Sequence, residues 1–216
     1  MLIVPGIGLF VVADGMGGHN GGEVASAIAV RVLQEFLSGE ERLDANGVAE
    51  GLRLANDEIL SAAEGSPEYE GMGTTVVTAI AREGRLVYGS VGDSRLYLWR
   101  RGRLTQLTKD DSWVSRVLPA DVQGSAELSA HPMRHVLTKV VGVRSDLDPA
   151  VGDCPFDAGD ALLLCSDGLH GTVRDDAIAQ TMAIDAGVDA IAQSLVDQAL
   201  AGGATDNVTV VVVRKA

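Results

Sequence analysis

Four aspartates stand at the ends of apolar or β-branched runs, in positions where they could bind a common ligand. Asp14 ends the run GLFVVAD, Asp167 ends LLLCSD, Asp206 precedes NVTVVVV, and Asp93 lies within GSVGDSRLY. Carboxylates at the edge of a hydrophobic core are costly unless something compensates their charge. Hard divalent cations such as Mg²⁺ or Mn²⁺ take oxygen ligands. Each aspartate alone is typical of a turn or a helix N-cap, but the four together indicate a metal site.

A glycine-rich segment surrounds Asp14 and reads VVADGMGGHNGGEVAS over residues 11–26. Two of its glycines have the spacing of a phosphate-binding loop, but Glu23 stands where that loop needs a lysine. A dinucleotide-binding pattern that starts at Gly15 also fails, because its last position is Asn20. The segment is therefore not predicted to hold phosphate with its backbone. Instead, the carbonyl of Gly15 can approach an ion beside Asp14.

The composition limits the possible partners. The net charge of −13 argues against nucleic acid and anionic membranes as partners. Cys154 and Cys165 form no disulfide framework, so a reducing cytoplasm is expected, and Cys165 is interpreted as a packed thiol. The uncharged residues 1–13 contain Pro5 and two glycines and are too short for a membrane span, so they predict a buried strand, over residues 6–13.

The elements that position the aspartates come in blocks. Short turns join the β-rich segments from residue 74 to 108, so these strands must be antiparallel neighbours. Apolar spacing predicts helices, and a single domain over residues 1–216 of class α+β is expected, with antiparallel sheets covered by helices. The predicted helices are 23–37, 44–63, 112–118, 133–140, 175–182 and 189–200; the later strands are 160–166 and 207–214.

Five ordered blocks resemble the metal-dependent protein phosphatases of type 2C, and most closely their bacterial branch. These blocks are DGMGGHNGGEVAS, GMGTTVV, GSVGDSRLY, LLLCSDGL and ATDNVTVVVV, and together they cover nearly the whole chain. The resemblance implies a central β-sandwich of two antiparallel sheets flanked by helices on both sides. It also implies a binuclear Mn²⁺ or Mg²⁺ centre at one end, and a flap over residues 109–143.

The resemblance assigns roles to individual residues. Asp14 would bridge both metals and Gly15 would lend its carbonyl, while Asp167 and Asp206 would ligate one metal. Asp93, together with Asp167, would form a third and weaker metal site. A water activated between the metals would then attack phosphorus, so that Asp14, Asp167 and Asp206 act catalytically through that water.

The chain also departs from the family pattern. Relatives carry a motif Arg-x-x-Asn-Glu-Asp upstream of the first Asp-Gly block, but no acid precedes Asp14 and no arginine precedes Arg31. The domain is therefore expected to be truncated at its N-terminus, without the phosphate-binding arginine, and to bind the second metal weakly. Met16 stands where many eukaryotic members have a histidine proposed as the general acid.

The histidines give weaker signals. His19 is interpreted as a loop or cap residue, and His170 as a packing residue. A zinc site at His131 and His135 is rejected, because the proline between them spoils a regular helix face.

Three hypotheses follow from the resemblance. The first is a cytoplasmic phosphatase that hydrolyses phosphoserine and phosphothreonine on phosphorylated proteins and opposes a cognate bacterial Ser/Thr kinase. The second, motivated by the missing arginine and glutamate, is a catalytically weak or inactive phosphatase-like module that binds or regulates. The third keeps the fold but acts on anti-sigma-factor antagonists.

Overall fold

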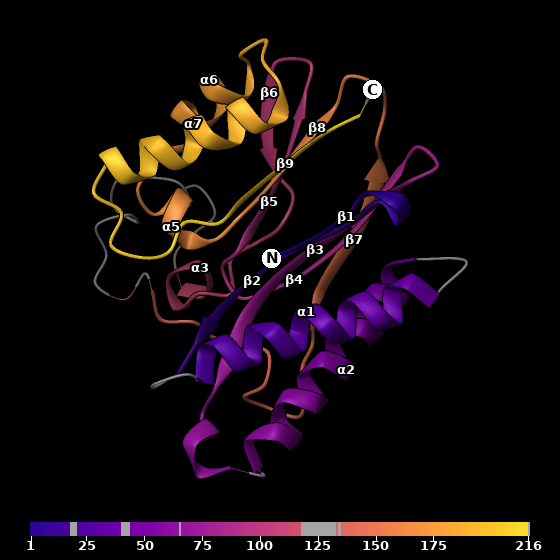
Figure 1. Cartoon of the computed structure of the whole chain (residues 1–216), viewed down its shortest axis with the longest axis vertical. Coiled ribbons are helices and arrows are strands. Elements are labelled where there is room, and N and C mark those ends of the chain that lie inside the picture. Colours follow the sequence, from indigo (N-terminus) through magenta and orange to yellow (C-terminus); the bar gives the residue numbers. More distant parts are fainter. Residues whose placement is uncertain (18–20, 40–43, 65, 118–132, 134, 216) are drawn as a thin grey trace.

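The computed structural model of the chain describes residues 1–17, 21–39, 44–64, 66–117, 133 and 135–215. Two antiparallel sheets pack face to face, and helices cover the outer face of each sheet (Figure 1). The predicted α+β sandwich with helices on both sides is confirmed. None of the helices in this described part of the chain has the length and apolarity of a membrane span.

The first sheet has five strands and lies under α1 (Gly21–Gly39) and α2 (Ala45–Glu64). The short turn at Glu83-Gly84 makes its third and fourth strands antiparallel neighbours, as predicted. In spatial order the strands are β1 (Leu2–Val4), β2 (Leu9–Met16), β3 (Gly73–Arg82), β4 (Arg85–Val91) and β7 (Ala150–Pro155).

The second sheet has four strands and lies under α6 (Asp175–Met182) and α7 (Val188–Ala201). In spatial order its strands are β6 (Arg103–Gln106), β5 (Arg95–Arg100), β8 (Ala161–Cys165) and β9 (Val210–Arg214). The short helices are α3 (Trp113–Val117) and α5 (Asp167–His170), with 3-10 turns at Pro5–Ile7 and Pro67–Tyr69.

Three apolar clusters hold the four layers together. Branched aliphatic side chains dominate all three, as expected for a chain with 4% aromatic residues. Leu33 and Leu52 represent the cluster between the helices α1 and α2 and the first sheet. Val77 and Leu164 lie between the two sheets, and Leu163 packs the second sheet against α6 and α7.

The antiparallel order gives the sandwich two chemically different ends. The strands β2 and β8 run toward one end, where Asp14 and Asp167 stand, and β9 starts from the same end after Asp206. The hairpin turns Glu83-Gly84 and Arg101-Gly102 lie at the opposite end.

Some predicted elements differ from the structure. The strand expected over residues 6–13 begins only at Leu9, because Pro5 starts a 3-10 turn that Gly8 ends in a left-handed conformation, and β1 before this turn was not predicted. The helix expected over 133–140 is wrong for the described residues, since Val136 and Thr138 bond instead to Trp113 and Asp111. The edge strand β7 was not predicted, because AVGDCP lacks a β-branched run. Of the piece expected over 112–118, residues 113–117 are helical.

Candidate functional site

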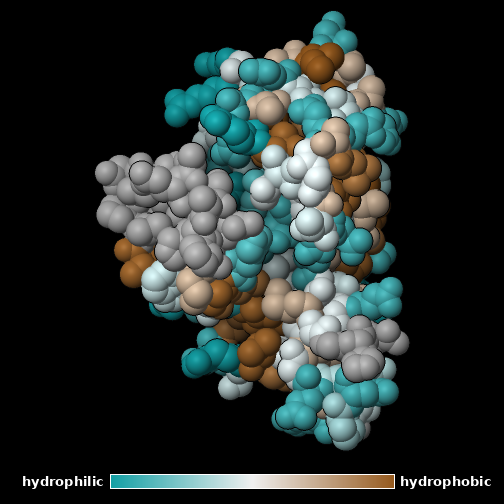
Figure 2. All heavy atoms as spheres, turned by 90° about the vertical axis from the view of Figure 1, so that its left-hand side faces the viewer, coloured by the Kyte–Doolittle hydropathy of each residue, from teal (hydrophilic) through white to brown (hydrophobic). Residues whose placement is uncertain are grey.

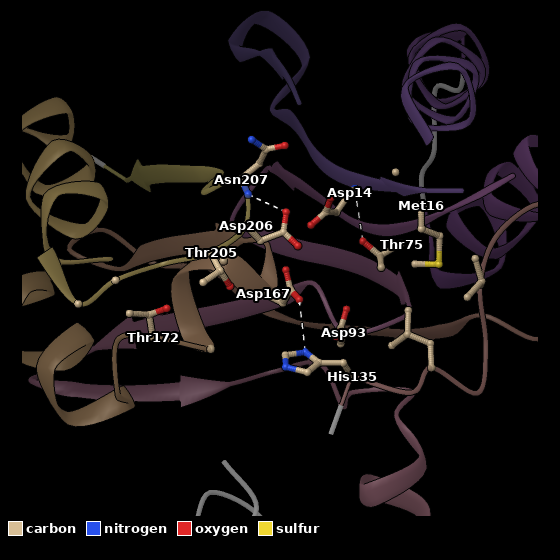
Figure 3. A pocket seen from close by; sticks show the side chains of 17 residues that line it. Asp14, Met16, Thr75, Asp93, His135, Asp167, Thr172, Thr205, Asp206 and Asn207 are labelled. Atoms are coloured by element: carbon tan, nitrogen blue, oxygen red, sulfur yellow. Dashed lines mark hydrogen bonds and ion pairs between the residues drawn. The ribbon is translucent and has the colours of Figure 1, made fainter. Parts of the chain in front are cut away.

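A pocket of about 920 Å³ opens at the end of the sandwich where the strand-end aspartates stand. Its lining brings together every residue that the sequence predicted as a metal ligand: Asp14, Gly15, Asp93, Asp167 and Asp206. Figure 3 shows the carboxylates of Asp14, Asp167 and Asp206 pointing into a common space, with Asp93 beside them. Figure 2 looks onto this end of the molecule, where hydrophilic residues form much of the surface in the middle of the view. The predicted residues therefore converge in space.

Hydroxyl groups of β3 fix the backbone of Asp14 on both sides. The Asp14 amide donates to Thr75 Oγ1 at 3.3 Å, and Thr74 Oγ1 donates to the Asp14 carbonyl at 2.9 Å. Thr75 Oγ1 also shares a buried hydrogen bond of 2.7 Å with Ser94 Oγ. Because Ser94 follows Asp93, this bond connects the strand ends that carry two of the aspartates.

Glycines allow the chain segments around Asp14 to approach one another closely. A Cβ atom on Gly15 would lie 1.8 Å from the carbonyl oxygen of Gly22, and a Cβ on Gly22 would lie 2.6 Å from the Gly15 carbonyl carbon. The end of β2 therefore packs directly against the start of α1. This contact explains why the segment is rich in glycine, although its backbone does not have a phosphate-binding pattern.

A second close approach places Asp167 beside Asp206. A Cβ on Gly168 would lie 2.3 Å from the carbonyl oxygen of Asn207. Ser166 Oγ donates to the same carbonyl at 3.1 Å and accepts from the Thr209 amide. The start of α5 is thus fixed against the loop that leads into β9.

Burial and mutual repulsion raise the pKa of the clustered carboxyls. Burial, followed by the charges of Asp167 and Asp206, raises the pKa of Asp14 from 3.8 to about 7. Burial and the charge of Asp167 likewise raise the pKa of Asp93 from 3.8 to about 7. The pKa of Asp167 is also raised, by burial and by Asp206. No arginine or lysine lines the described part of the pocket, so the described residues balance this charge only in part, through Arg95 near Asp93 and His135 near Asp167.

The pocket fits a hard divalent cation. Asp167 Oδ1 is buried and has no hydrogen-bond partner among the described residues, although a buried acceptor ordinarily has one. Within the same residues, no three His, Cys, Asp or Glu side chains form a group that could hold an ion. Such a set is not required, because Mg²⁺ keeps several waters and is bound through one or two carboxylates. Carboxylates and the Gly15 carbonyl are ligands of the right type.

A histidine of α5 contacts the backbone of Asp93. His170 Nε2 donates to the Asp93 carbonyl at 2.9 Å, since a carbonyl can only accept. Burial lowers the pKa of His170 from 6.5 to about 3, so the ring is neutral. The predicted packing role of His170 is therefore confirmed, with this hydrogen bond added.

The two ends of the segment over 109–143 are fixed beside the pocket. The amide of Asp111 donates to the Gly92 carbonyl at 2.8 Å, and the Thr138 amide donates to the Asp111 carbonyl at 2.7 Å. The partly buried ion pair between Arg95 Nη2 and Asp110 Oδ2, at 2.7 Å, holds the start of the segment against β5. The role of this segment as a flap stays a prediction.

Several pocket residues were not predicted as functional. Thr75 and Asn207 lay inside the quoted blocks GMGTTVV and ATDNVTVVVV, so the sequence held a signal for them. His135 had no such signal, yet its Nδ1 lies 4.0 Å from Asp167 Oδ2 and its side chain is 58% exposed. His19 and His131 lie outside the described residues. Cys165 is fully buried, as predicted, and burial raises its pKa to about 12.

A two-sheet sandwich with an acidic pocket at one end, flanked by helices on both faces, is the architecture of metal-dependent protein phosphatases. The sequence profile of the Protein phosphatase 2C family matches residues 3–202, and the chain belongs to this family.

Bacterial relatives agree with this assignment. The serine/threonine protein phosphatase PstP of Mycobacterium tuberculosis is 37% identical over 97% of this chain, and the chain spans 41% of that relative's length. The serine/threonine phosphatase stp of Listeria monocytogenes is 35% identical over 96% of this chain and 84% of the relative.

Solved structures support the same family assignment. The crystal structure of the PstP catalytic domain in complex with two manganese ions has a TM-score of 0.84 and 37% identity, covering 94% of this chain and 86% of that one. The structure of Stp1 from Staphylococcus aureus has a TM-score of 0.87 and 32% identity, covering 94% of this chain and 82% of that one.

Proposed function

We propose that the chain is a metal-dependent phosphatase that hydrolyses phosphoserine and phosphothreonine on proteins. The observation that carries the proposal is the convergence of four carboxylates on one open pocket, where the buried Asp167 Oδ1 has no hydrogen-bond partner among the residues that the structure describes. The names of the relatives support the same reaction, and the two manganese ions of the PstP structure support the same cofactor.

The residues proposed to hold two Mn²⁺ or Mg²⁺ ions are Asp14, the Gly15 carbonyl, Asp167 and Asp206, with Asp93 and Asp167 at a third site. Divalent ions, when bound there, supply Lewis acidity and activate water at neutral pH. The chain itself contributes fixed geometry, because Thr74 and Thr75 hold the backbone of Asp14.

The remaining pocket groups are suited to binding and orienting a phosphate ester. Thr172, Thr205 and Asn207 supply neutral hydrogen-bond donors on the wall beside Asp206. A cysteine nucleophile is not proposed, because the pKa of Cys165, raised to about 12 by burial, keeps that thiol protonated. Hydrolysis would therefore use water directly, without a covalent phosphoenzyme.

The proposal extends to the setting of the reaction. The substrates would be phosphorylated proteins, and the opposing enzyme would be a bacterial Ser/Thr kinase in the same signalling pathway. The cytoplasm is the proposed location, in line with two cysteines that are both free thiols.

A second candidate is a non-catalytic module that binds phosphoproteins. The described lining of the pocket argues against efficient catalysis in one respect, because it contains no arginine or lysine to bind the phosphate of a substrate. Hydrolysis of p-nitrophenyl phosphate, with and without Mn²⁺, distinguishes the two candidates. The phosphatase proposal requires Mn²⁺-dependent turnover that Asp14→Ala abolishes, whereas the binding module shows no turnover under either condition.

A further inference from the structure

The end of the sandwich opposite the acidic pocket concentrates basic side chains. Seven of the 17 lysines and arginines of the chain lie at strand ends or turns there: Arg82, Arg85, Arg100, Arg101, Arg103, Arg214 and Lys215. Some of them are neutralised locally, since Arg85 pairs with Asp153 and Arg100 pairs with Asp160. In a chain with a net charge of −13, such a concentration is a local reversal of sign.

Three of these arginines surround the β5–β6 hairpin and line a groove of about 500 Å³. The groove is formed by Leu98, Arg100, Arg101, Arg103 and Thr105. Arg100 is fixed, because its Nε and Nη2 donate to Asp160 at 2.9 and 2.6 Å, and Nη2 also donates to the Pro155 carbonyl at 2.8 Å. These bonds leave the Nη1 group of Arg100 available to a ligand.

Arg101 and Arg103 are not engaged in the same way. Neither guanidinium has a hydrogen bond or ion pair with any residue that the structure describes. Both side chains belong to exposed residues next to the fixed Arg100. The hairpin therefore presents two unpaired cations and one preorganised cation along a single groove.

The backbone of the hairpin turn independently indicates that Arg101 does not stabilise the turn. Arg101 and Gly102 have φ of 50° and 79°, the left-handed values of a type I′ turn. Asn, Asp and Gly are favoured at the first of these positions. The β3–β4 turn has the same form, with Glu83 at φ 49° and Gly84 at 78°, and so offers a matched comparison.

The strand beside these arginines, β6, also has backbone groups that could pair with a partner strand. β6 stands at the edge of its sheet, paired to β5 on one side only within the described chain. An edge strand is a template for an added strand, to which main-chain hydrogen bonds give affinity and side-chain contacts give specificity. At β6 those side-chain contacts would come from arginines.

We propose that the β5–β6 hairpin docks an acidic, extended segment of a partner protein. The segment adds to the free edge of β6 through its main chain, while its carboxylates pair with Arg101 and Arg103. Arginine suits this task because its planar guanidinium binds carboxylates in a bidentate manner. The site lies at the opposite end of the sandwich from the acidic pocket and does not depend on the proposed phosphatase reaction.

A protein segment fits this surface better than a nucleic acid or a membrane. Both of those are extended polyanions, and the net charge of −13 would repel them over the rest of the contact. Glu83, Asp153 and Asp157 stand among the basic residues of this end and would face such a polyanion directly. A single peptide strand contacts only the hairpin and avoids these carboxylates.

The test uses a fluorescent peptide of alternating Asp and Thr, with binding measured by anisotropy at low salt in EDTA. The wild-type protein is expected to bind it, with an affinity that falls as salt rises. The double variant Arg101→Asn/Arg103→Thr is expected to bind roughly tenfold more weakly or worse, because two charge-assisted hydrogen bonds are lost. Its melting temperature should be equal to or above that of the wild type, since Asn suits the turn.

Glu83→Asn is the matched control, because it makes the same turn replacement in the β3–β4 hairpin and should leave peptide affinity undiminished. Peptide methylated on alternate backbone nitrogens should bind more weakly, because it cannot pair as a strand. The proposal is overturned if the wild type does not bind the peptide, or if the double variant or the methylated peptide binds as tightly as its parent. Tighter binding to phosphatidylserine vesicles or to an oligonucleotide than to the peptide also overturns it. Because EDTA removes divalent cations, peptide binding is measured without the proposed metal centre. A failure to bind the peptide can therefore be distinguished from a failure of the phosphatase proposal.

Discussion

At the two ends of the sandwich, carboxylates have opposite electrostatic surroundings, and their pKa values shift in opposite directions. At the pocket end, Asp14 and Asp93 face other aspartates, and burial together with this repulsion raises the pKa of each to about 7. At the far end, the side chain of Asp160 is 5% exposed, but it accepts two hydrogen bonds from Arg100, which lower its pKa.

This difference separates acids that stabilise the fold from acids that await a ligand. Asp160 is compensated by the protein, so its removal or exposure should affect folding. Asp14 is compensated by nothing in the described chain, so its charge destabilises the protein until a cation binds. Functional sites commonly show carboxyl groups whose pKa values are displaced by burial and by neighbouring charges.

The largest expected effect comes from removing an acid at the pocket end. Asp14→Ala should lower kcat/KM for p-nitrophenyl phosphate with Mn²⁺ by roughly 10²- to 10³-fold, because charge stabilisation at the reacting group is lost. Steady-state kinetics measure it. Asp153→Ala removes an exposed acid at the far end and should leave the kinetics unchanged. Equal kinetics for Asp14→Ala and the wild type would contradict the assignment.

Breaking the compensation at the far end should affect stability and spare activity. Arg100→Met leaves Asp160, whose side chain is 5% exposed, without its partner. Because the Arg100 side chain is 31% exposed and Asp160 keeps a hydrogen bond from the Asp157 amide, the loss should be about 1–2 kcal/mol, measurable by urea unfolding. Arg174→Met removes an exposed pair with Asp176 and should change stability by less than about 0.5 kcal/mol. If both variants behave alike, Arg100 does not compensate Asp160.

The pocket end should make the metal-free protein less stable as pH rises. The pKa of Asp14 and Asp93 is about 7 in the folded state and 3.8 ordinarily, so their unfolded forms lose protons first. Their contribution to stability is present below pH 3.8 and is lost as pH rises through 7.

Asp14→Asn should accordingly raise the free energy of unfolding at pH 7.5 in EDTA by about 1–2 kcal/mol, allowing for solvent screening of a half-buried carboxylate. Urea unfolding of the wild type and the variant measures the difference. A variant less stable than the wild type under these conditions would show that Asp14 is not a source of strain.

His170 should have a smaller effect on stability, and this effect should appear as pH falls. Its pKa is about 3 in the folded state and 6.5 ordinarily, so the unfolded chain takes up a proton first as pH falls. Stability is thus lost on acidification from pH 6.5, by about 1 kcal/mol over the first pH unit. His170→Gln can keep the hydrogen bond to the Asp93 carbonyl without titrating, and should remove this slope in urea unfolding. An unchanged slope would assign it to other groups.

Much of this arrangement could be predicted from the sequence. Asp14 and Asp167 each end an apolar run that predicts a buried strand, and short turns force the strands between residues 74 and 108 to be antiparallel. The convergence of the acids follows from these two facts. Metal ligation by them stays a prediction.

Other features depend on contacts that no local pattern records. β7 is an edge strand with little burial, so it lacks the alternation that marks a strand. The segment around His135 has helical spacing, but its backbone bonds go to Asp111 and Trp113, far away in the sequence. The role of Gly15 was visible only in part, because its tight contact with Gly22 belongs to the packing of α1 on β2.

The central claim is that the pocket end binds divalent cations through Asp14. Calorimetric titration of Mn²⁺ into the wild type and into Asp14→Asn at pH 7.5 tests it most directly. We expect saturable binding to the wild type and an affinity at least about tenfold lower for Asp14→Asn. A wild type that binds no Mn²⁺, or a variant that binds it equally well, would contradict the account.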